Sequence, residues 1–401
     1  MTAWLSTHGL FVALLIGLAA RVVLITIIFG WGAVPTTSDD ATYVRFAGKL
    51  LEDGRIATHF PLGYSVFVAG FLSLGEGAFV AIRAAHVLAG LLTVLATYRI
   101  SELLFGRRAG LIAAFTTALY PPLAFMTGRI MSETLFICLL TLSLLAFVRA
   151  DREGSARRSA LGALLFGVGS TVRSNLIPMV PFIPLWLLSG RTKLRGRLER
   201  VTTASVVLVV VLALPGFFFL QTTGEFVPLA TNGGQTLYGA NNPLADGGWV
   251  EVNDHPELLA SVPEDIRESP ALFDKAQRTL ALTWMRDHPT AFLSLLPKKF
   301  ANAWIPGLQR SETTERSPLA AAVLVIVSAI LILAAVLGRA LVRPAARDGI
   351  LLGVLATYTA MSLIFYGNPR IGLFCAPILI VYGSAFGSWL WVRLVEQSAR
   401  P

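Results

Sequence analysis

Four long apolar windows that contain no charged residue most constrain what this chain can fold into. They lie between Arg200 and Glu225, Arg316 and Arg339, Asp348 and Arg370, and Arg370 and Arg393. A helix needs about 20 such residues to cross roughly 30 Å of hydrocarbon. Only 14% of all residues are charged, whereas soluble domains average about 25%. We therefore predict an integral membrane protein.

Six more apolar runs, interrupted by charges, occupy the first half of the chain. They predict helices near residues 9–29, 78–104, 109–121, 132–150, 158–172 and 175–189. Together with the four windows, they predict an all-α polytopic membrane protein with about ten transmembrane helices in a single membrane-embedded domain, 1–401. The first run lacks the basic start of a signal peptide, so we expect it to be retained.

The positions of lysine and arginine predict the orientation. In the ten-helix topology the short arginine-rich loops fall on one side, which the positive-inside rule assigns to the cytoplasm. Two long segments, 30–77 and 222–316, fall on the other side, and the second holds more acids than bases. The formal charge of +9 therefore reports topology and does not predict a nucleic-acid surface. We expect a multi-pass protein of the inner (plasma) membrane.

The stretch DDATYVRFAGKLLEDG follows the first predicted span. Its apolar residues are spaced as one face of a helix; they are Tyr43, Val44, Phe46, Ala47, Leu50 and Leu51. This pattern predicts an amphipathic helix on the outer membrane surface. The acids at its start, Asp39 and Asp40, are candidate functional groups, although Ser38 or Asp39 as a helix N-cap is an alternative explanation.

Several short motifs lie on the predicted outer side. They are Asp39-Asp40-Ala41-Thr42-Tyr43, Pro61-Leu62-Gly63-Tyr64, Ser132-Glu133, Asn232-Gly233-Gly234, Ala240-Asn241-Asn242-Pro243 and the stretches 286–304 and 368–380. In order and spacing the sequence resembles the lipid-dependent membrane glycosyltransferases of the GT-C class, in particular bacterial relatives of the protein O-mannosyltransferases and of the aminoarabinose transferases that modify lipid A. Phe60 stands where some members carry a lysine before a proline pair.

The resemblance implies transfer of a sugar from a polyprenyl-phosphate donor to a hydroxyl group on the periplasmic or exterior side. The acceptor is a glycolipid, a polysaccharide or a protein. Asp39 is the candidate general base, because a carboxylate must accept the hydroxyl proton, and Asp40 is its orienting neighbour. These two acids could hold a divalent metal, but we expect none to be required.

Arginines near the outer membrane boundary are candidate ligands of the donor phosphate. Charge develops on the phosphate as the glycosidic bond breaks, and arginine at membrane depth usually faces a cavity or a partner. We predict this role for Arg370, Arg173 and Arg129; for Arg129, extension to the membrane interface is an equal alternative.

Other residues are candidates for donor or acceptor binding. They are Tyr43, His59, Tyr64, Glu133 and Asn241. The alternatives are ordinary hydrogen bonding for His59, a favourable helix-dipole interaction for Glu133, and turn formation for Asn241 and its neighbours. A polytopic transporter or lipid flippase, or a non-catalytic scaffold, are the competing functional classes.

Overall fold

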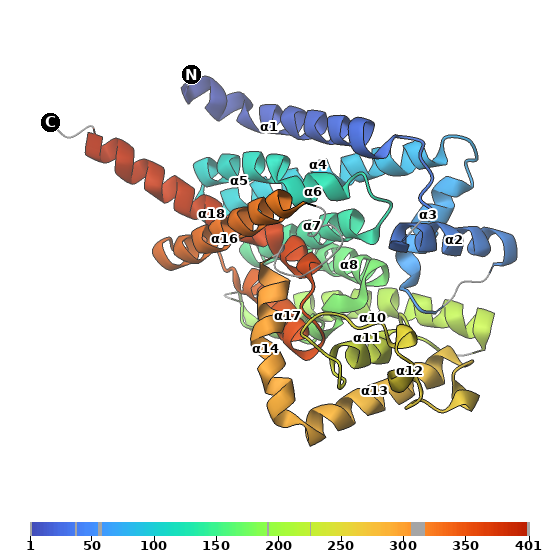
Figure 1. The fold of residues 1–401 in the computed structure, drawn as a ribbon. Helices are drawn as coiled ribbons and strands as arrows, with labels where there is room; N and C mark the ends of the chain where they lie inside the picture. Colours follow the sequence, from blue (N-terminus) through green and yellow to red (C-terminus); the bar gives the residue numbers. More distant parts are fainter. Residues whose placement is uncertain are drawn as a thin grey trace.

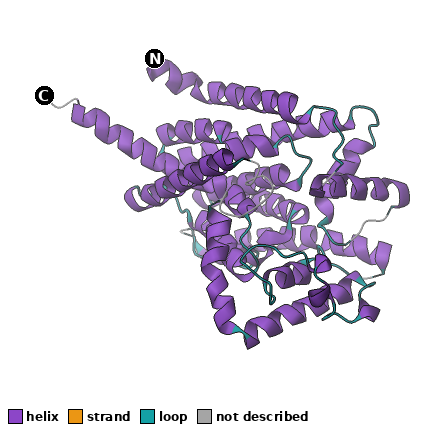
Figure 2. Ribbon diagram, in the orientation of Figure 1, coloured by secondary structure: helices purple, strands orange, loops and turns teal. Residues whose placement is uncertain are grey.

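The computed structural model of the chain describes residues 2–36, 38–54, 58–190, 192–224, 226–305 and 317–398. Over these residues the chain consists of helices joined by turns and loops, with no strand (Figures 1 and 2). This confirms the predicted all-α class.

Six helical segments of the described chain are long and apolar enough to cross a membrane. They belong to α1 (Thr2–Leu24) with its π-helical continuation η1 (Ile25–Phe29), α4 (Ala78–Phe105), α7 (Ser132–Glu153), α10 (Leu194–Thr223), α16 (Pro318–Leu341) and α18 (Pro369–Ser398). The protein is therefore a multi-pass membrane protein.

The four remaining predicted spans are also helical, but shorter. They are α5 (Arg107–Leu119), α8 (Ala156–Val172), η2 (Ser174–Met179) followed by α9 (Phe182–Leu188), and α17 (Gly349–Ile364). All ten predicted segments thus form helices, while ten complete crossings remain a prediction.

Helix α7 lies at the centre of the bundle. It packs against α4 and α8, and α8 in turn packs against α10. Phe136, Leu144 and Phe147 of α7 are almost completely buried in the main apolar core. Helix α10 instead exposes Val209 and Leu214, which is favourable where the surrounding solvent is lipid. Because α7 is central, its first turn also lies in the middle of the molecule, at the end of the helix bundle that we predict to face outward.

The first outer segment contains α2 (Ser38–Asp53) and α3 (Leu62–Leu72), which pack against each other. The predicted amphipathic helix is present as α2: Tyr43 and Ala47 are buried, while Leu51 is half exposed. Its placement on the membrane surface remains a prediction, and the Ser38 side chain lies outside those described. The short helices α3 and α6 (Pro121–Met126) have no counterpart in the sequence-based prediction.

The second outer segment is mostly helical. It comprises α11 (Gly233–Ala240), η3 (Val252–Asp254), α12 (Pro256–Leu259), η4 (Glu264–Ile266), α13 (Pro270–Asp287) and α14 (Pro289–Trp304); residues 225 and 306–316 of the predicted segment lie outside the described chain. Gly234 allows α11 to touch α13, because a Cβ there would collide with the carbonyl oxygen of Asp274. The Asp274 carboxylate accepts the Gly234 amide at 2.6 Å. This contact fixes the first turn of α11.

The basic residues at the other end of the helices contribute to structure. Arg200 is completely buried and, together with Arg347, pairs with the Asp151 carboxylate, at 3.3 and 3.0 Å. These ion pairs join α7, α10 and the turn before α17 at the predicted cytoplasmic end. The first turns of α7 and α18 and the last turn of α8 lie at the opposite end.

Candidate active site

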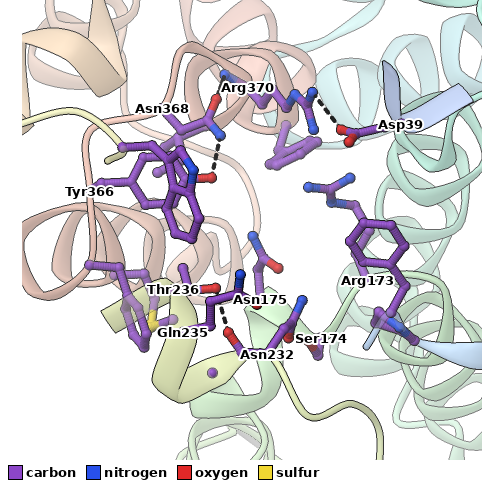
Figure 3. Close-up of a pocket in the computed structure, with 18 of the residues that line it drawn as sticks. Asp39, Arg173, Ser174, Asn175, Asn232, Gln235, Thr236, Tyr366, Asn368 and Arg370 are labelled. Atoms are coloured by element: carbon purple, nitrogen blue, oxygen red, sulfur yellow. Dashed lines mark hydrogen bonds and ion pairs between the residues drawn. The ribbon is translucent and has the colours of Figure 1, made fainter. Parts of the chain in front are cut away.

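A cavity of about 630 Å³ lies where these outer helix ends meet. Its wall is assembled from α2, the turn 59–61, the α8–η2 junction, α11, the stretch 249–251 and the end of α17 with the start of α18. Figure 3 shows charged side chains at one end, with Asp39, Arg173 and Arg370, and uncharged polar side chains at the other. Segments from most of the chain thus converge on one site.

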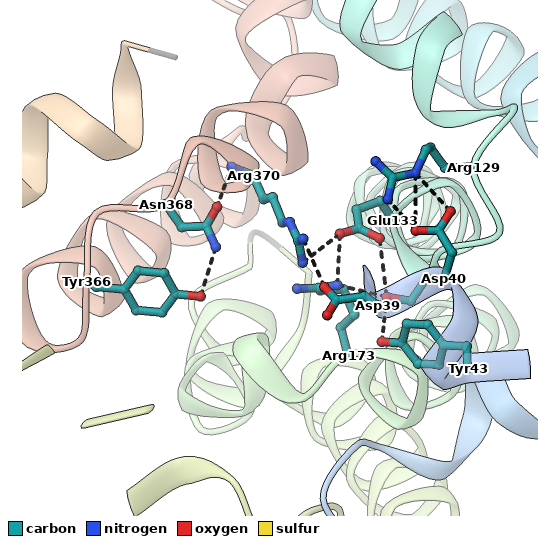
Figure 4. Close-up of polar contacts among 10 residues, drawn as sticks. Asp39, Asp40, Tyr43, Arg129, Glu133, Arg173, Tyr366, Asn368 and Arg370 are labelled. Carbon is teal, nitrogen blue, oxygen red and sulfur yellow. Dashed lines mark hydrogen bonds and ion pairs between the residues drawn. The ribbon is translucent and has the colours of Figure 1, made fainter. Parts of the chain in front are cut away.

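The charged end is organised by two arginines that share a carboxylate. Arg370 pairs with Asp39 Oδ2 at 2.9 Å and with Glu133 Oε1 at 3.3 Å. Arg173 pairs with the same Glu133 oxygen at 3.2 Å (Figure 4). Glu133 is completely buried, whereas the Asp39 and Arg370 side chains are 40% and 38% exposed. The buried Glu133 therefore holds two cations at the cavity, and of these two acids only Asp39 lines it.

Hydrogen bonds fix the orientation of these groups. The Ser132 hydroxyl accepts from Arg173 at 2.8 Å and from the Tyr43 hydroxyl at 3.2 Å. Burial raises the pKa of Tyr43, against the opposing effect of the nearby Arg173. The phenol of Tyr43 therefore stays protonated and acts as a donor, which ties α2 to the first turn of α7.

The second acid of α2 has a separate partner. Asp40, which is 6% exposed, accepts Arg129 Nε at 2.8 and 3.1 Å and also pairs with Nη2. The hydrogen bond to Asp40 raises the pKa of Arg129. Neither residue lines the cavity. Arg129, which we predicted to bind the donor phosphate, is thus engaged with Asp40 and positions α2 against the loop before α7.

The residues at this site do not fit a divalent metal ion. In the part of the chain that the structure describes, no group of three His, Cys, Asp or Glu side chains is placed to hold one. The carboxylates of Asp39, Asp40 and Glu133 each face an arginine, whereas hard divalent cations need several free oxygen ligands. Metal independence of the reaction remains a prediction.

The other predicted ligands divide into two groups. Tyr43 and His59 line the cavity, and burial lowers the pKa of His59, so its neutral form prevails at neutral pH. Tyr64 and Asn241 are completely buried elsewhere. Tyr64 bonds His86 Nε2 at 3.2 Å, and Asn241 donates to the carbonyl oxygens of Leu237 and Ile364. Tyr64 and Asn241 therefore do not line the cavity; their role in donor or acceptor binding stays a prediction.

Lys299 is an important residue that the sequence analysis did not identify. It is completely buried, and its Nζ donates to Asn241 Oδ1 at 2.7 Å and to the Leu363 carbonyl oxygen at 3.4 Å. Burial lowers its pKa to about 8. Gly367 permits close packing here, since a Cβ would collide with the Lys299 carbonyl. Helix α14 thus fixes the turn before Arg370. The signals in the sequence were the family-like stretch 286–304, in which Lys299 lies, and the lysine pair 298–299 in an otherwise apolar helix.

The end of the cavity away from the arginines was also missed as a unit. Asn175, Asn232, Gln235, Trp249 and Tyr366 line it, together with Glu251. They come from η2, the turn before α11, α11 itself, and two loops. No local pattern joins these positions, although the Asn232 motif was among those quoted from the sequence.

Comparison with known proteins supports the fold. Residues 59–215 match the family described as dolichyl-phosphate-mannose-protein mannosyltransferase. No curated protein matches the chain in sequence. The archaeal oligosaccharyltransferase AglB from Archaeoglobus fulgidus, in complex with an inhibitory peptide and a dolichol-phosphate, superposes with a TM-score of 0.56 and 15% identity over 99% of this chain and 53% of that chain. An oligosaccharyltransferase from the same organism, in complex with Zn and sulfate, gives a TM-score of 0.51 and 17% identity over 96% and 49% of the two chains.

These likenesses show that the chain has the fold of the GT-C membrane glycosyltransferases. A part of it resembles the mannosyltransferase family in sequence as well. The chain spans about half the length of these two solved structures.

Proposed function

We propose that this protein transfers a sugar from a polyprenyl-phosphate donor to a hydroxyl group of an acceptor outside the plasma membrane. The observation that carries the proposal is the pair Arg173 and Arg370, held at the cavity by the buried Glu133 and adjacent to Asp39. Two fixed guanidinium groups suit a phosphate, because each offers several parallel donors. The site also lies at the ends of apolar helices, where a donor with its lipid tail in the bilayer places its phosphate.

In this mechanism the acceptor oxygen attacks C1 of the donor sugar, and the bond between C1 and the phosphate oxygen breaks. The acceptor proton passes to Asp39. The leaving group is polyprenyl phosphate, whose extra negative charge develops in the transition state and is stabilised by Arg173 and Arg370. The N-terminus of α18, at which Arg370 lies, adds favourable partial positive charge.

Because Asp39 and Arg370 form an ion pair, binding of the donor phosphate also affects the Asp39 carboxylate. While Asp39 Oδ2 is bonded to Arg370, that oxygen is not free to accept the hydrogen of the acceptor hydroxyl. When the donor phosphate binds Arg370, it competes with Asp39 for the same donors and releases the carboxylate toward the acceptor. Donor binding thus prepares the base, while Glu133 keeps the two arginines in place.

The test uses purified full-length protein with polyprenyl-phosphate sugars and measures release of free polyprenyl phosphate that depends on acceptor. Arg370→Ala should lower both kcat and donor affinity, and Arg370→Lys should restore only part of the loss, because lysine cannot reproduce the forked geometry. Arg286→Ala is the matched control: this arginine belongs to the same outer side, is 74% exposed and pairs with the adjacent Asp287.

Two results would contradict the proposal. Loss of thermal stability in Arg370→Ala with an unchanged donor KM in the folded fraction would make Arg370 a purely structural residue. Movement of intact donor lipid across vesicles without cleavage would instead favour the transporter class.

A further inference from the structure

We infer that Arg83, which does not line the cavity, is a positioning residue that holds Asp39 in place for proton transfer. This inference rests on the proposed function, because it concerns how the proposed base is placed. It names a residue outside the cavity on which the rate of transfer depends and donor binding does not.

Arg83 binds two separate stretches of backbone. It lies in the second turn of α4 and is only 4% exposed. Its guanidinium donates to three carbonyl oxygens, those of Trp31 from Nη1 at 2.7 Å, Ala33 from Nη2 at 2.9 Å and Gly128 from Nε at 3.2 Å. Arginine at membrane depth usually faces a cavity or a partner, and the partners of this arginine are therefore main-chain groups.

Both stretches lead into the charged end of the active site. Residues 30–36 follow η1 and directly precede α2, whose first turn carries Asp39. Gly128 belongs to the turn 127–131 between α6 and α7, which also carries Arg129. Arg83 therefore fixes the separation between the approach to α2 and the turn before α7.

The ion pair between Arg129 and Asp40 joins the same two regions at a second point (Figure 4). Successive residues of an α-helix point about 100° apart around its axis, so fixing Asp40 also fixes the direction of Asp39. The contacts form a closed ring that runs through residues 30–36, Asp40, Arg129, Gly128 and Arg83. Loss of the Arg83 contacts opens this ring and frees the first turn of α2.

The forked shape of arginine is needed for this arrangement. The three hydrogen bonds come from three different nitrogen atoms, whereas lysine carries all of its donors on one atom. Gly128 permits the close contact of its turn with the end of η1, since a Cβ there would lie 2.1 Å from the Phe29 ring. A lysine at position 83 keeps the charge but cannot bridge the same carbonyl groups.

The arginines proposed to bind the donor phosphate are held by a different residue. Arg173 and Arg370 both pair with Glu133, which is completely buried in the first turn of α7. Movement of α2 thus shifts Asp39 and leaves the two arginines in place. A misplacement of about 1 Å can cost about 10²-fold in rate even when the substituted residue is far from the chemistry.

The kinetic test uses purified full-length Arg83→Lys and Arg83→Gln with whichever of polyprenyl-phosphate glucose, mannose or glucosamine the wild-type protein turns over. Each variant should lower kcat by about 10- to 100-fold. Donor affinity should stay within about fivefold, the limit set by the exposed Asp39–Arg370 pair. Arg200→Lys is the matched control, because this arginine is also buried and donates to a backbone carbonyl, that of Ala150, at the opposite end of the helices; kcat of its folded fraction should equal that of wild type.

Two further measurements show whether Arg83 acts through Asp39. In an Asp39→Asn background, Arg83→Lys should change the remaining rate by less than about twofold, because no base is left to misplace. Hydrogen exchange of residues 39–46 requires no substrate. It should become faster in Arg83→Lys and stay unchanged in Arg200→Lys, since only the first substitution lets the start of α2 open more easily.

The outcomes separate this inference from the proposed function. An unchanged kcat in the Arg83 variants, or a rate loss that adds fully to that of Asp39→Asn, would overturn the inference, and so would unchanged exchange at the start of α2. If Arg83→Lys does not fold, Arg83→Gln gives the same readouts. If the wild-type protein releases no polyprenyl phosphate, the proposed function fails; faster exchange confined to the start of α2 would then still uphold Arg83 as the residue that holds Asp39 in place.

Discussion

Replacing Asp39 by Asn should separate catalysis from donor binding. The substitution keeps the side-chain shape but removes the charge that accepts the proton in the proposed mechanism, a contribution that typically accounts for about 10²- to 10⁴-fold in rate. We therefore expect kcat to fall by that factor. Glu133 still pairs with Arg370 at 3.3 Å, so the arginine should keep its place and the protein should fold normally.

Donor affinity should change in the opposite direction. In the proposed mechanism Asp39 competes with the donor phosphate for Arg370, and removing its charge frees the guanidinium. Because the two side chains are 40% and 38% exposed, the ion pair is worth at most about 1 kcal/mol. That limits the gain to about fivefold tighter donor binding. A lower kcat with equal or tighter donor binding is therefore the result we expect if Asp39 is the general base and pairs with Arg370, the proposed phosphate-binding residue.

The assay is a titration of purified Asn variant with the donor lipid, paired with single-turnover release of polyprenyl phosphate. Asp265→Asn, an exposed acid of the second outer segment, is the matched control and should behave as wild type. Near-normal turnover of the Asp39 variant would refute the base assignment. A tenfold or greater loss of donor binding, with turnover of bound donor unchanged, would show that Asp39 binds substrate and does not accept the proton.

Four further results are expected. Asp40→Asn should reduce turnover less than Asp39→Asn does, and it should lower the melting temperature, since it breaks a largely buried ion pair. Burial lowers the pKa of Lys299 to about 8, so the unfolded chain binds more protons above that pH; unfolding free energy should rise as pH increases from about 8 toward the usual lysine range, and Lys299→Met should remove this slope in pH-dependent melting. In intact cells Ala245→Cys should react with an impermeant thiol reagent, and Arg195→Cys should not; reversed labelling would invert the topology. Chelation with EDTA should leave turnover unchanged, and a loss restored by one added divalent metal would contradict the arginine-based site.

The sequence by itself determined the class of structure. In hydrocarbon every backbone polar group must be satisfied within the chain, so long apolar runs have to form helices, and all ten predicted segments do. The α2 helix was equally predictable, because its apolar residues repeat at helical spacing. The resemblance of short motifs to a known family also identified Asp39, Glu133 and Arg370 as candidate site residues. In the structure Arg370 forms ion pairs with both acids.

Only the tertiary structure decided which side chains share the cavity. Asp39 and Arg370 are 331 positions apart in the chain, and helical periodicity says which face of a helix is apolar but not which helix packs against it. For the same reason the sequence placed Arg129, Tyr64 and Asn241 among the ligands, whereas packing gave each a partner away from the cavity. Asn175 and Gln235 were likewise recognisable as lining one cavity only in the structure, because the wall of a cavity depends on every segment that surrounds it.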